Sequence, residues 1–219
     1  METKVSENLK LIETDAGLCL TDGRLELMAD FRDMLPRLKQ SNLEHEMIIK
    51  AVRIKSQDMP QTVLDATAGL GEDSLILAAA GFNVRLYEYD PVIAALLEDA
   101  LKRANNLPEL ESVAARMEFY QEDSIQAMRT LSQAPDVVLL DPMFPGRQKS
   151  AKIKKKFQLL QQLESPCSNE DELLDAAIST GAKKIVIKRP LKGPFLAGRK
   201  PSYSLSGKVI RYDCLIINA

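Results

Sequence analysis

The 219-residue sequence is poor in cysteine and nearly lacks histidine. Cys19, Cys167 and Cys214 lie far apart, and His45 is the single histidine. Because the chain has no Cys-x-x-Cys pair and an odd number of cysteines, we expect neither a zinc site nor a disulfide framework. The pattern fits the reducing conditions of the cytoplasm.

Long apolar runs are also missing. No run approaches the roughly 18 residues that a membrane-spanning helix needs, and residues 1–5 start without the apolar core of a secretory signal. We therefore expect a cytoplasmic protein with no membrane partner and no metal. The length suits one sizeable core with room for a small appendage.

Acidic residues are scarce in the last third of the chain. Residues 1–146 carry 25 acids and 14 basic residues, whereas residues 147–219 carry 6 acids and 15 basic residues. The two parts thus have net charges of −11 and +9. Such a split predicts a surface that faces a polyanion, although a solvated basic face without a partner is the alternative.

Residues 1–58 predict a small extension made of a β-hairpin and a helix. Asp22-Gly23 lies between alternating apolar residues and predicts a two-residue hairpin turn. Ser41 and Glu44 are spaced as a capping box, which predicts a helix start. The apolar face of that helix would hold Leu43, Met47, Ile48, Ala51 and Val52.

From residue 59 onward, expected strands and helices alternate. This alternation predicts a single domain over residues 59–219 with a doubly wound, mostly parallel sheet. The expected strands cover 62–65, 83–88, 117–120, 136–140, 184–188 and 209–217. The expected helices cover 72–80, 91–104, 124–131, 151–163 and 170–177.

The strand expected at 136–140 ends in an unusual sequence. Its apolar residues are followed by Asp141-Pro142-Met143-Phe144-Pro145. Pro142 has no N–H to donate and should end the strand. An open α/β sheet binds ligands at the carboxyl ends of its strands. An acid and a flat ring at that position suit a planar base with an amino group, and an ordinary proline turn is the alternative.

Residues 65–74, with the sequence DATAGLGEDS, join the first of these strands to its helix. Gly69 and Gly71 allow the backbone to approach a ligand at the helix N-terminus. The third glycine of a dinucleotide-binding loop is replaced by Ser74, and the two acids before it would repel a pyrophosphate. A cofactor with a cationic amino-acid end fits better, and a tight strand-to-helix turn is the alternative.

Two further strand ends carry acids. Glu88 is placed to accept both hydroxyls of a ribose, with Tyr89 beside it to lie against an adenine. Asp123-Ser124 follows the third strand, where the acid can bind an adenine amino group or cap the next helix. Together with the glycine loop, these positions point to S-adenosylmethionine.

Three longer motifs resemble those of a known protein family. They are Asp65-Ala-Thr-Ala-Gly-Leu-Gly-x-Asp73, Asp141-Pro-Met-Phe-Pro-x-x-Gln148-Lys149-Ser150-Ala151 and Val186-Ile-Lys188-Arg189-Pro190. Over residues 59–219 the sequence resembles the ribosomal RNA small-subunit methyltransferase J family. The resemblance implies the seven-stranded, Rossmann-like fold of class I S-adenosylmethionine-dependent methyltransferases. It also implies methylation of the exocyclic N2 amine of a guanine in 16S rRNA.

The loop and the resemblance together define an expected cofactor site. Its residues are Asp65, Gly69, Gly71, Glu72, Asp73, Glu88, Tyr89, Asp123, Ser124 and Asp141. For catalysis we expect the Asp141 carboxylate and the Pro142 carbonyl to accept hydrogen bonds from the guanine amino group. Phe144 would stack on the base.

The basic residues after the strand end predict an RNA-binding track. Ile153, Phe157 and Leu160 recur at helical spacing and should face the core. Lys152, Lys155 and Lys156 would then point outward. We expect phosphate contacts from Arg147, Lys149, Lys152, Lys155, Lys156, Lys188 and Arg189. The expected partner is small-subunit rRNA, free or in an assembling subunit.

Two other functions stay open at this point. A methyltransferase of the same fold could act on another exocyclic amine, such as adenine N6 in RNA or DNA. A non-catalytic RNA-binding or ribosome-assembly factor could also keep the fold. A dehydrogenase is disfavoured by Ser74 and by the acids of the glycine loop.

Overall fold

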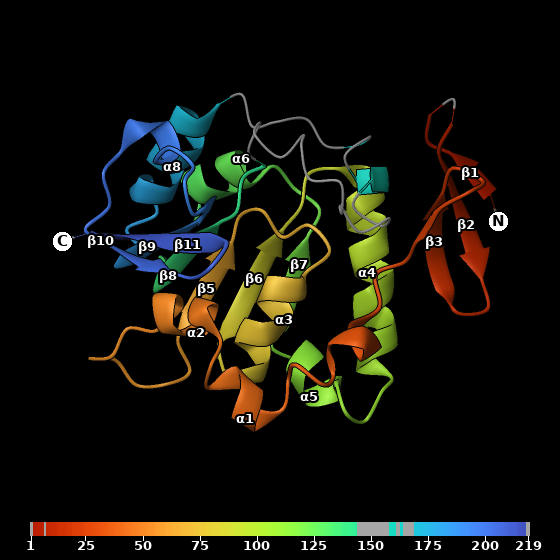
Figure 1. Cartoon of the computed structure of the whole chain (residues 1–219), viewed down its shortest axis with the longest axis horizontal. Helices are drawn as coiled ribbons and strands as arrows, with labels where there is room; N and C mark the ends of the chain where they lie inside the picture. The colour runs from red at the N-terminus through yellow and green to blue at the C-terminus, as the bar shows by residue number, and fades with distance from the viewer. Residues whose placement is uncertain (1, 7, 144–157, 161–162, 164–168, 218–219) are drawn as a thin grey trace.

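A computed structural model describes the chain except for residues 1, 7, 144–157, 161–162, 164–168 and 218–219. The described residues form two sheets (Figure 1). The smaller has the order β1-β2-β3-β4, and the larger has the order β10-β11-β9-β8-β5-β6-β7. The strands of the smaller sheet are β1 (Glu2–Lys4), β2 (Lys10–Thr14), β3 (Gly17–Thr21) and β4 (Glu26–Leu27).

The seven-stranded sheet confirms the predicted doubly wound topology. Its strands are β5 (Thr62–Asp65), β6 (Asn83–Tyr87), β7 (Met117–Tyr120), β8 (Val137–Leu140), β9 (Lys184–Pro190), β10 (Tyr203–Ser206) and β11 (Ile210–Ile216). β11 is antiparallel to both of its neighbours, and the pairs among β5–β9 are parallel. The chain runs from β5 outward to β7 and then returns to β8 beside β5. The carboxyl ends of β5 and β8 therefore form the switch point at which such sheets bind ligands.

Helices cover both faces of this sheet (Figure 1). One core includes residues of α2 (Met47–Val52), α3 (Glu72–Ala79), α4 (Pro91–Asn105) and α5 (Glu111–Ala114). The other includes residues of α6 (Ser124–Arg129), α8 (Glu170–Ser179) and the 3-10 turn η2 (Leu196–Gly198). Every residue of β8 is buried, and its side chains alternate between the two cores. This two-sided burial explains its uninterrupted apolar sequence.

Local signals placed most helix ends correctly. The Asp90 carboxylate accepts hydrogen bonds from the Val92 and Ile93 N–H groups, with Pro91 at the first helical position of α4. Gly81, with φ 95°, follows the end of α3. Both arrangements match the usual capping rules, with proline at the start of a helix and glycine just past its end.

One predicted turn and one predicted helix start differ from the structure. The β3–β4 connection spans four residues, because the Asp22 carboxylate accepts hydrogen bonds from both Arg24 and Leu25 N–H. The expected capping box at Ser41 does not form. Instead α1 (Gln40–Leu43) starts after Lys39, and α2 starts separately after Glu46. Glu46 has extended backbone and pairs with Arg37, which separates the two short helices.

Several elements gave no clear sequence signal. β10 was missed because it is a polar edge strand with mostly exposed residues. β1, β2, α5 and the 3-10 turn η1 (Phe31–Met34) were also missed. Of the helix expected at 151–163, the described residues 158–160 and 163 are helical, and the rest lies outside the described residues.

Helix α2 belongs to the predicted N-terminal extension, but it packs into the main core. Ile48, Ala51 and Val52 are buried there. The buried Lys184 ammonium donates hydrogen bonds to the carbonyls of Ala51 and Arg53 (3.0 and 2.8 Å), which closes the end of α2. The division of the chain at residue 58 therefore stays a prediction.

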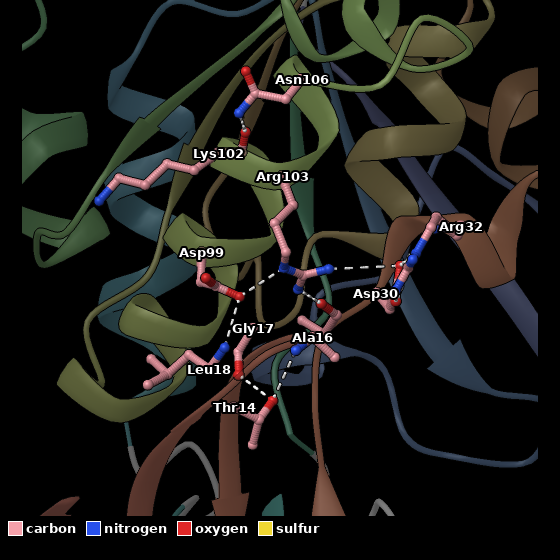
Figure 2. A network of polar contacts seen from close by, with 11 residues as sticks. Thr14, Ala16, Gly17, Leu18, Asp30, Arg32, Asp99, Lys102, Arg103 and Asn106 are labelled. Atoms are coloured by element: carbon pink, nitrogen blue, oxygen red, sulfur yellow. Dashed lines mark hydrogen bonds and ion pairs between the residues drawn. The ribbon is translucent and has the colours of Figure 1, made fainter. Parts of the chain in front are cut away.

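The four-stranded sheet is held against α4 by polar contacts (Figure 2). The Leu18 N–H donates to the Asp99 carboxylate at 3.0 Å, and Arg103 Nε donates to the same carboxylate at 2.9 Å. Arg103 also donates to the Ala29 carbonyl and lies 3.6 Å from the Asp30 carboxylate. A Cβ at Gly17 would lie only 2.5 Å from Arg103 Nε. A side chain at residue 17 would therefore displace Arg103, and the φ of 136° also favours glycine there.

We expect Arg103→Leu to loosen this sheet without unfolding the main domain. The variant removes the donor to Ala29 and leaves Asp99 without its cation, whereas Asp30 keeps its ion pair with Arg32. Amide exchange should accelerate in β2 and β3 by about tenfold, because a part-buried charged hydrogen bond contributes roughly 1.5–3 kcal/mol. Lys102→Leu, an exposed neighbour on α4, is the control. Equal protection in both variants would show that Arg103 does not hold the sheet.

Candidate functional site

Acidic side chains gather where the strands of the large sheet end. Asp65 is the last residue of β5, Glu88 follows β6, and Asp141 follows β8. Asp123 precedes α6, close after β7. Because parallel neighbours end at the same edge of a sheet, these residues lie along one edge, beside the β5–β8 switch point.

The loop after β5 is tied to both neighbouring strands. The Ala66 N–H donates to the Leu139 carbonyl at 3.0 Å, and the Ala68 N–H donates to the Tyr87 carbonyl at 3.1 Å. The Thr67 hydroxyl accepts a hydrogen bond from the Asp141 N–H at 2.6 Å. The loop thereby fixes the backbone of Asp141.

Asp65 is buried beneath the loop and accepts hydrogen bonds from two of its residues. It is 2% exposed; one of its oxygens accepts from the Ser74 hydroxyl at 2.6 Å and the other from the Thr67 N–H at 3.2 Å. Burial raises the pKa of Asp65 to about 7, although the bonds from Ser74 and Thr67 oppose the rise. Ser74, the departure from the dinucleotide pattern, is thus the residue that ties α3 to β5.

We expect the stability of the protein to fall as pH rises from about 4 to about 7, because the folded Asp65 binds a proton that the unfolded carboxyl has already lost. Asp65→Asn removes this dependence. The free energy of unfolding of the native sequence should decline relative to the variant by roughly 4 kcal/mol across that window. Urea unfolding at several pH values measures it. The exposed Asp175→Asn is the control, and parallel curves for native and Asp65→Asn proteins would contradict the assignment.

The two loop glycines have different roles. Both have positive φ, 55° at Gly69 and 77° at Gly71. A Cβ at Gly71 would lie 2.6 Å from a methyl carbon of Leu97, so this glycine is needed for packing. A Cβ at Gly69 would meet nothing within 4 Å. Only Gly69 therefore presents backbone to open space, as a ligand-binding position requires.

The predicted ribose-binding and adenine-binding residues lie at the same edge. The Glu88 carboxylate accepts from the Gly69 N–H and the Asp90 N–H, both at 2.9 Å, and burial raises its pKa. Tyr89 is 74% exposed beside it. Asp123 accepts from the Ile125 N–H at 2.9 Å and so caps α6, with Ser124 at its first position.

Lys188 joins two of the predicted site residues. Its ammonium lies 2.5 Å from the Asp73 carboxylate and 2.9 Å from the Asp141 carboxylate. Burial by itself lowers the pKa of Lys188, but Asp141 and Asp73 outweigh it, and the net pKa is raised well above the ordinary lysine value. The lysine is therefore a permanent cation between the first turn of α3 and the end of β8.

Two of the predicted RNA-contacting residues, Lys188 and Arg189, lie in different surroundings. Lys188 is 19% exposed and faces the two carboxylates, whereas Arg189 is only 1% exposed and pairs with Glu170. Burial makes Arg189 unsuitable for the outward-facing track in which we placed it. Alternation along β9 sends the two side chains to opposite faces of the sheet. The other predicted track residues, Arg147, Lys149, Lys152, Lys155 and Lys156, and the predicted stacking residue Phe144, lie outside the described residues.

Other parts of the site gave weaker signals in the sequence. Thr67, Ser74 and the bridging role of Lys188 were not anticipated. Tyr87 and Tyr120 end neighbouring parallel strands in register, and their rings stack with centroids 5.0 Å apart. The matching tyrosines at two expected strand ends could have indicated this pair.

Within the described residues, no group of histidine, cysteine or acidic side chains is arranged to hold a metal ion. The helices of that same part of the chain include none with the length and apolar content to cross a membrane. Cys19 and Cys214 are buried free thiols.

Comparisons with known proteins agree on one family. A family model described as "Putative SAM-dependent methyltransferase" matches residues 2–217. Ribosomal RNA small subunit methyltransferase J of Pseudoalteromonas atlantica is 40% identical over 226 residues, covering 98% of this chain and 87% of the relative. The protein of the same name from Pseudomonas aeruginosa is 47% identical over 169 residues, or 77% of this chain. That alignment spans 64% of the relative's length.

A solved structure supports the same assignment. A SAM-dependent methyltransferase from Neisseria gonorrhoeae superimposes with a TM-score of 0.79 at 32% identity, over 98% of this chain and 86% of that one. The chain therefore belongs to the ribosomal RNA small subunit methyltransferase J family of SAM-dependent methyltransferases.

Proposed function

We propose that this protein transfers a methyl group from S-adenosylmethionine to the exocyclic N2 amine of a guanine in small-subunit rRNA. The observation that carries the proposal is the placement of Asp141 and Pro142 at the β5–β8 switch point, against the glycine loop. The relatives named above as small-subunit rRNA methyltransferases support the substrate class. Such an enzyme would work in the cytoplasm, on free rRNA or on an assembling subunit.

The charge and shape of the site fit S-adenosylmethionine. The open space in front of Gly69 admits a ligand close to the backbone. Glu88 sits at the end of β6, where a carboxylate can accept ribose hydroxyls. The first turn of α3 holds Glu72 and Asp73, which suits a cationic ammonium group rather than a phosphate. Asp123 and Tyr89 would bind the adenine.

The chain's own residues orient the nucleophile. A guanine amino group is a weak nucleophile because its lone pair is delocalised into the ring. Asp141 is 40% exposed, so its carboxylate can accept one N–H of that amine, while the Pro142 carbonyl accepts the other. This turns the lone pair toward the methyl group. The sulfonium of the cofactor, when bound, supplies an activated methyl, so catalysis consists mainly of alignment.

Asp141 also has a second task. The nitrogen loses a proton as its bond to the methyl carbon forms and the sulfur–carbon bond breaks, and the Asp141 carboxylate is placed to receive that proton. Lys188 pairs with the Asp141 carboxylate, and the Thr67 hydroxyl accepts from the Asp141 N–H. Asp141 is therefore already oriented and need not reorganise during the reaction. The base must leave its stack to reach this position. Phe144, next but one to Pro142, would stack on it there.

A methyl-transfer assay tests the proposal. Unmethylated small-subunit rRNA, free and in assembled particles, is incubated with labelled S-adenosylmethionine, and the product nucleosides are separated. N2-methylguanine is the expected product. N6-methyladenine as the product would show instead that the enzyme methylates the exocyclic N6 amine of adenine. Cofactor binding without transfer to any RNA would indicate a non-catalytic RNA-binding factor.

A further inference from the structure

The segment that follows β9 is held in place by Arg189, which is buried. This segment, residues 191–199, leaves the same edge of the sheet as Asp141. Arg189 Nε donates to the Pro194 carbonyl at 3.1 Å, and Arg189 Nη1 donates to Glu170 at 3.2 Å. The same Glu170 accepts from the Ala197 N–H at 3.1 Å, where Ala197 has φ 49°. A non-glycine residue in this conformation persists only where its surroundings hold it.

A second buried arginine, on the neighbouring strand β11, also binds the segment. Arg211 of β11 is 7% exposed and donates to the carbonyls of Pro190, Leu191 and Gly193 at 2.8–3.0 Å. Its guanidinium lies 5.1 Å from the ring centroid of Phe195. The aromatic ring is therefore fixed by a cation–π contact, and the segment is ordered before any partner binds.

The fixed segment presents apolar and basic side chains together. Leu191 donates its N–H to the Val209 carbonyl, so these two exposed residues are neighbours. Phe195 keeps 37% of its surface exposed although Arg211 lies against it. Lys192 and Lys208 are exposed beside them. We call these five residues, Leu191, Lys192, Phe195, Lys208 and Val209, the loop patch.

The chemistry of the loop patch favours single-stranded RNA over a protein or a lipid surface. Residues 183–212 contain no acid, so nothing in this stretch repels phosphate. A fixed aromatic ring flanked by lysines is the usual means of binding unpaired bases, which stack on the ring while the cations contact the backbone. The acidic sheet edge beside it would not bind phosphate itself.

We infer that the loop patch binds unpaired nucleotides that flank the target base, with one base stacked on Phe195. This inference rests on the proposed function, because it takes RNA as the substrate. β8 and β9 are parallel neighbours, so Asp141 after β8 and the segment after β9 leave the same edge of the sheet one strand apart. An RNA strand whose target base lies at Asp141 would therefore continue over the loop patch.

Binding of a fluorescent single-stranded oligoadenylate and of a blunt RNA duplex tests the inference in the full chain. Phe195→Ala should weaken oligoadenylate binding about tenfold, since one stacked base contributes roughly 1–3 kcal/mol. Duplex binding should change far less. Lys208→Glu should weaken both and reduce their salt dependence. Tyr203→Ala and Lys102→Glu are matched controls. Tyr203 is exposed near Lys184 and Ile216, at the opposite ends of β9 and β11 from the loop patch, and Lys102 is exposed on α4.

The outcomes separate this inference from the proposed function. RNA binding that depends on Phe195 but is not accompanied by methyl transfer would support the loop patch and contradict the proposed methyltransferase function. Methyl transfer by a native protein whose Phe195→Ala variant binds oligoadenylate normally would overturn the loop patch alone. Self-association of the native protein that Phe195→Ala abolishes, with RNA affinity unchanged, would also overturn it. S-adenosylmethionine affinity, which should stay equal in all variants, reports that they are folded.

Discussion

Asp141→Ala is expected to lower kcat for methyl transfer to rRNA about a thousandfold while the protein stays folded. Loss of one preorganised hydrogen-bonding group at a reacting centre typically costs 10²–10³ in rate, and this variant also loses the proton acceptor. The Asp141 side chain is 40% exposed and packs in neither core, so no cavity results. Single-turnover transfer from labelled S-adenosylmethionine, beside a thermal unfolding curve, measures both effects.

Two variants make that test selective. Asp175→Ala removes an exposed carboxylate on α8 and should leave transfer unchanged. Asp141→Asn keeps one oxygen that can accept from the amine but loses the charge that pairs with Lys188. It should therefore retain more activity than Asp141→Ala and less than the native protein. Transfer at the native rate by Asp141→Ala would remove Asp141 from the mechanism.

The sheet and its ligand edge were predictable because the signals are local. β8 is buried on both faces and therefore has four consecutive apolar residues. Asp90-Pro91, followed by residues with helical apolar spacing, marks a helix start, and Gly81 marks a helix end. Since parallel strands end at a common edge, the order of such signals also places Asp65, Glu88 and Asp141 together.

The contacts between those residues were not predictable, because they depend on which face each side chain takes. Lys188 and Arg189 are adjacent basic residues with the same sequence signal. In β9 they point to opposite faces, so Lys188 meets Asp141 while Arg189 meets Glu170. Gly69 and Gly71 are equivalent in the loop pattern, but only Gly71 is pressed against Leu97. The edge strand β10 has few buried residues and hence no apolar alternation to detect.

Lys188→Met is the second variant with a large expected effect. It removes the cation that lies within 3 Å of both Asp73 and Asp141. The two carboxylates then repel each other, and Asp141 loses the contact that fixes its orientation. We expect kcat to fall about a hundredfold, since misplacement of about an ångström can cost that much. Lys188→Arg, which keeps the charge, should restore part of the rate.

The pH profile and the RNA affinity distinguish positioning from phosphate binding by Lys188. Without its cation, a carboxylate takes up a proton more readily, so the acid limb of the kcat profile should move to higher pH in Lys188→Met. RNA affinity should stay the same, because the Lys188 side chain is only 19% exposed and its ammonium is paired with two acids. Lys183→Met, which breaks an exposed lysine–aspartate pair at the other end of β9, should change neither quantity. If Lys188→Met instead weakens RNA binding with kcat and its pH profile intact, the lysine contacts phosphate, as the sequence alone suggested.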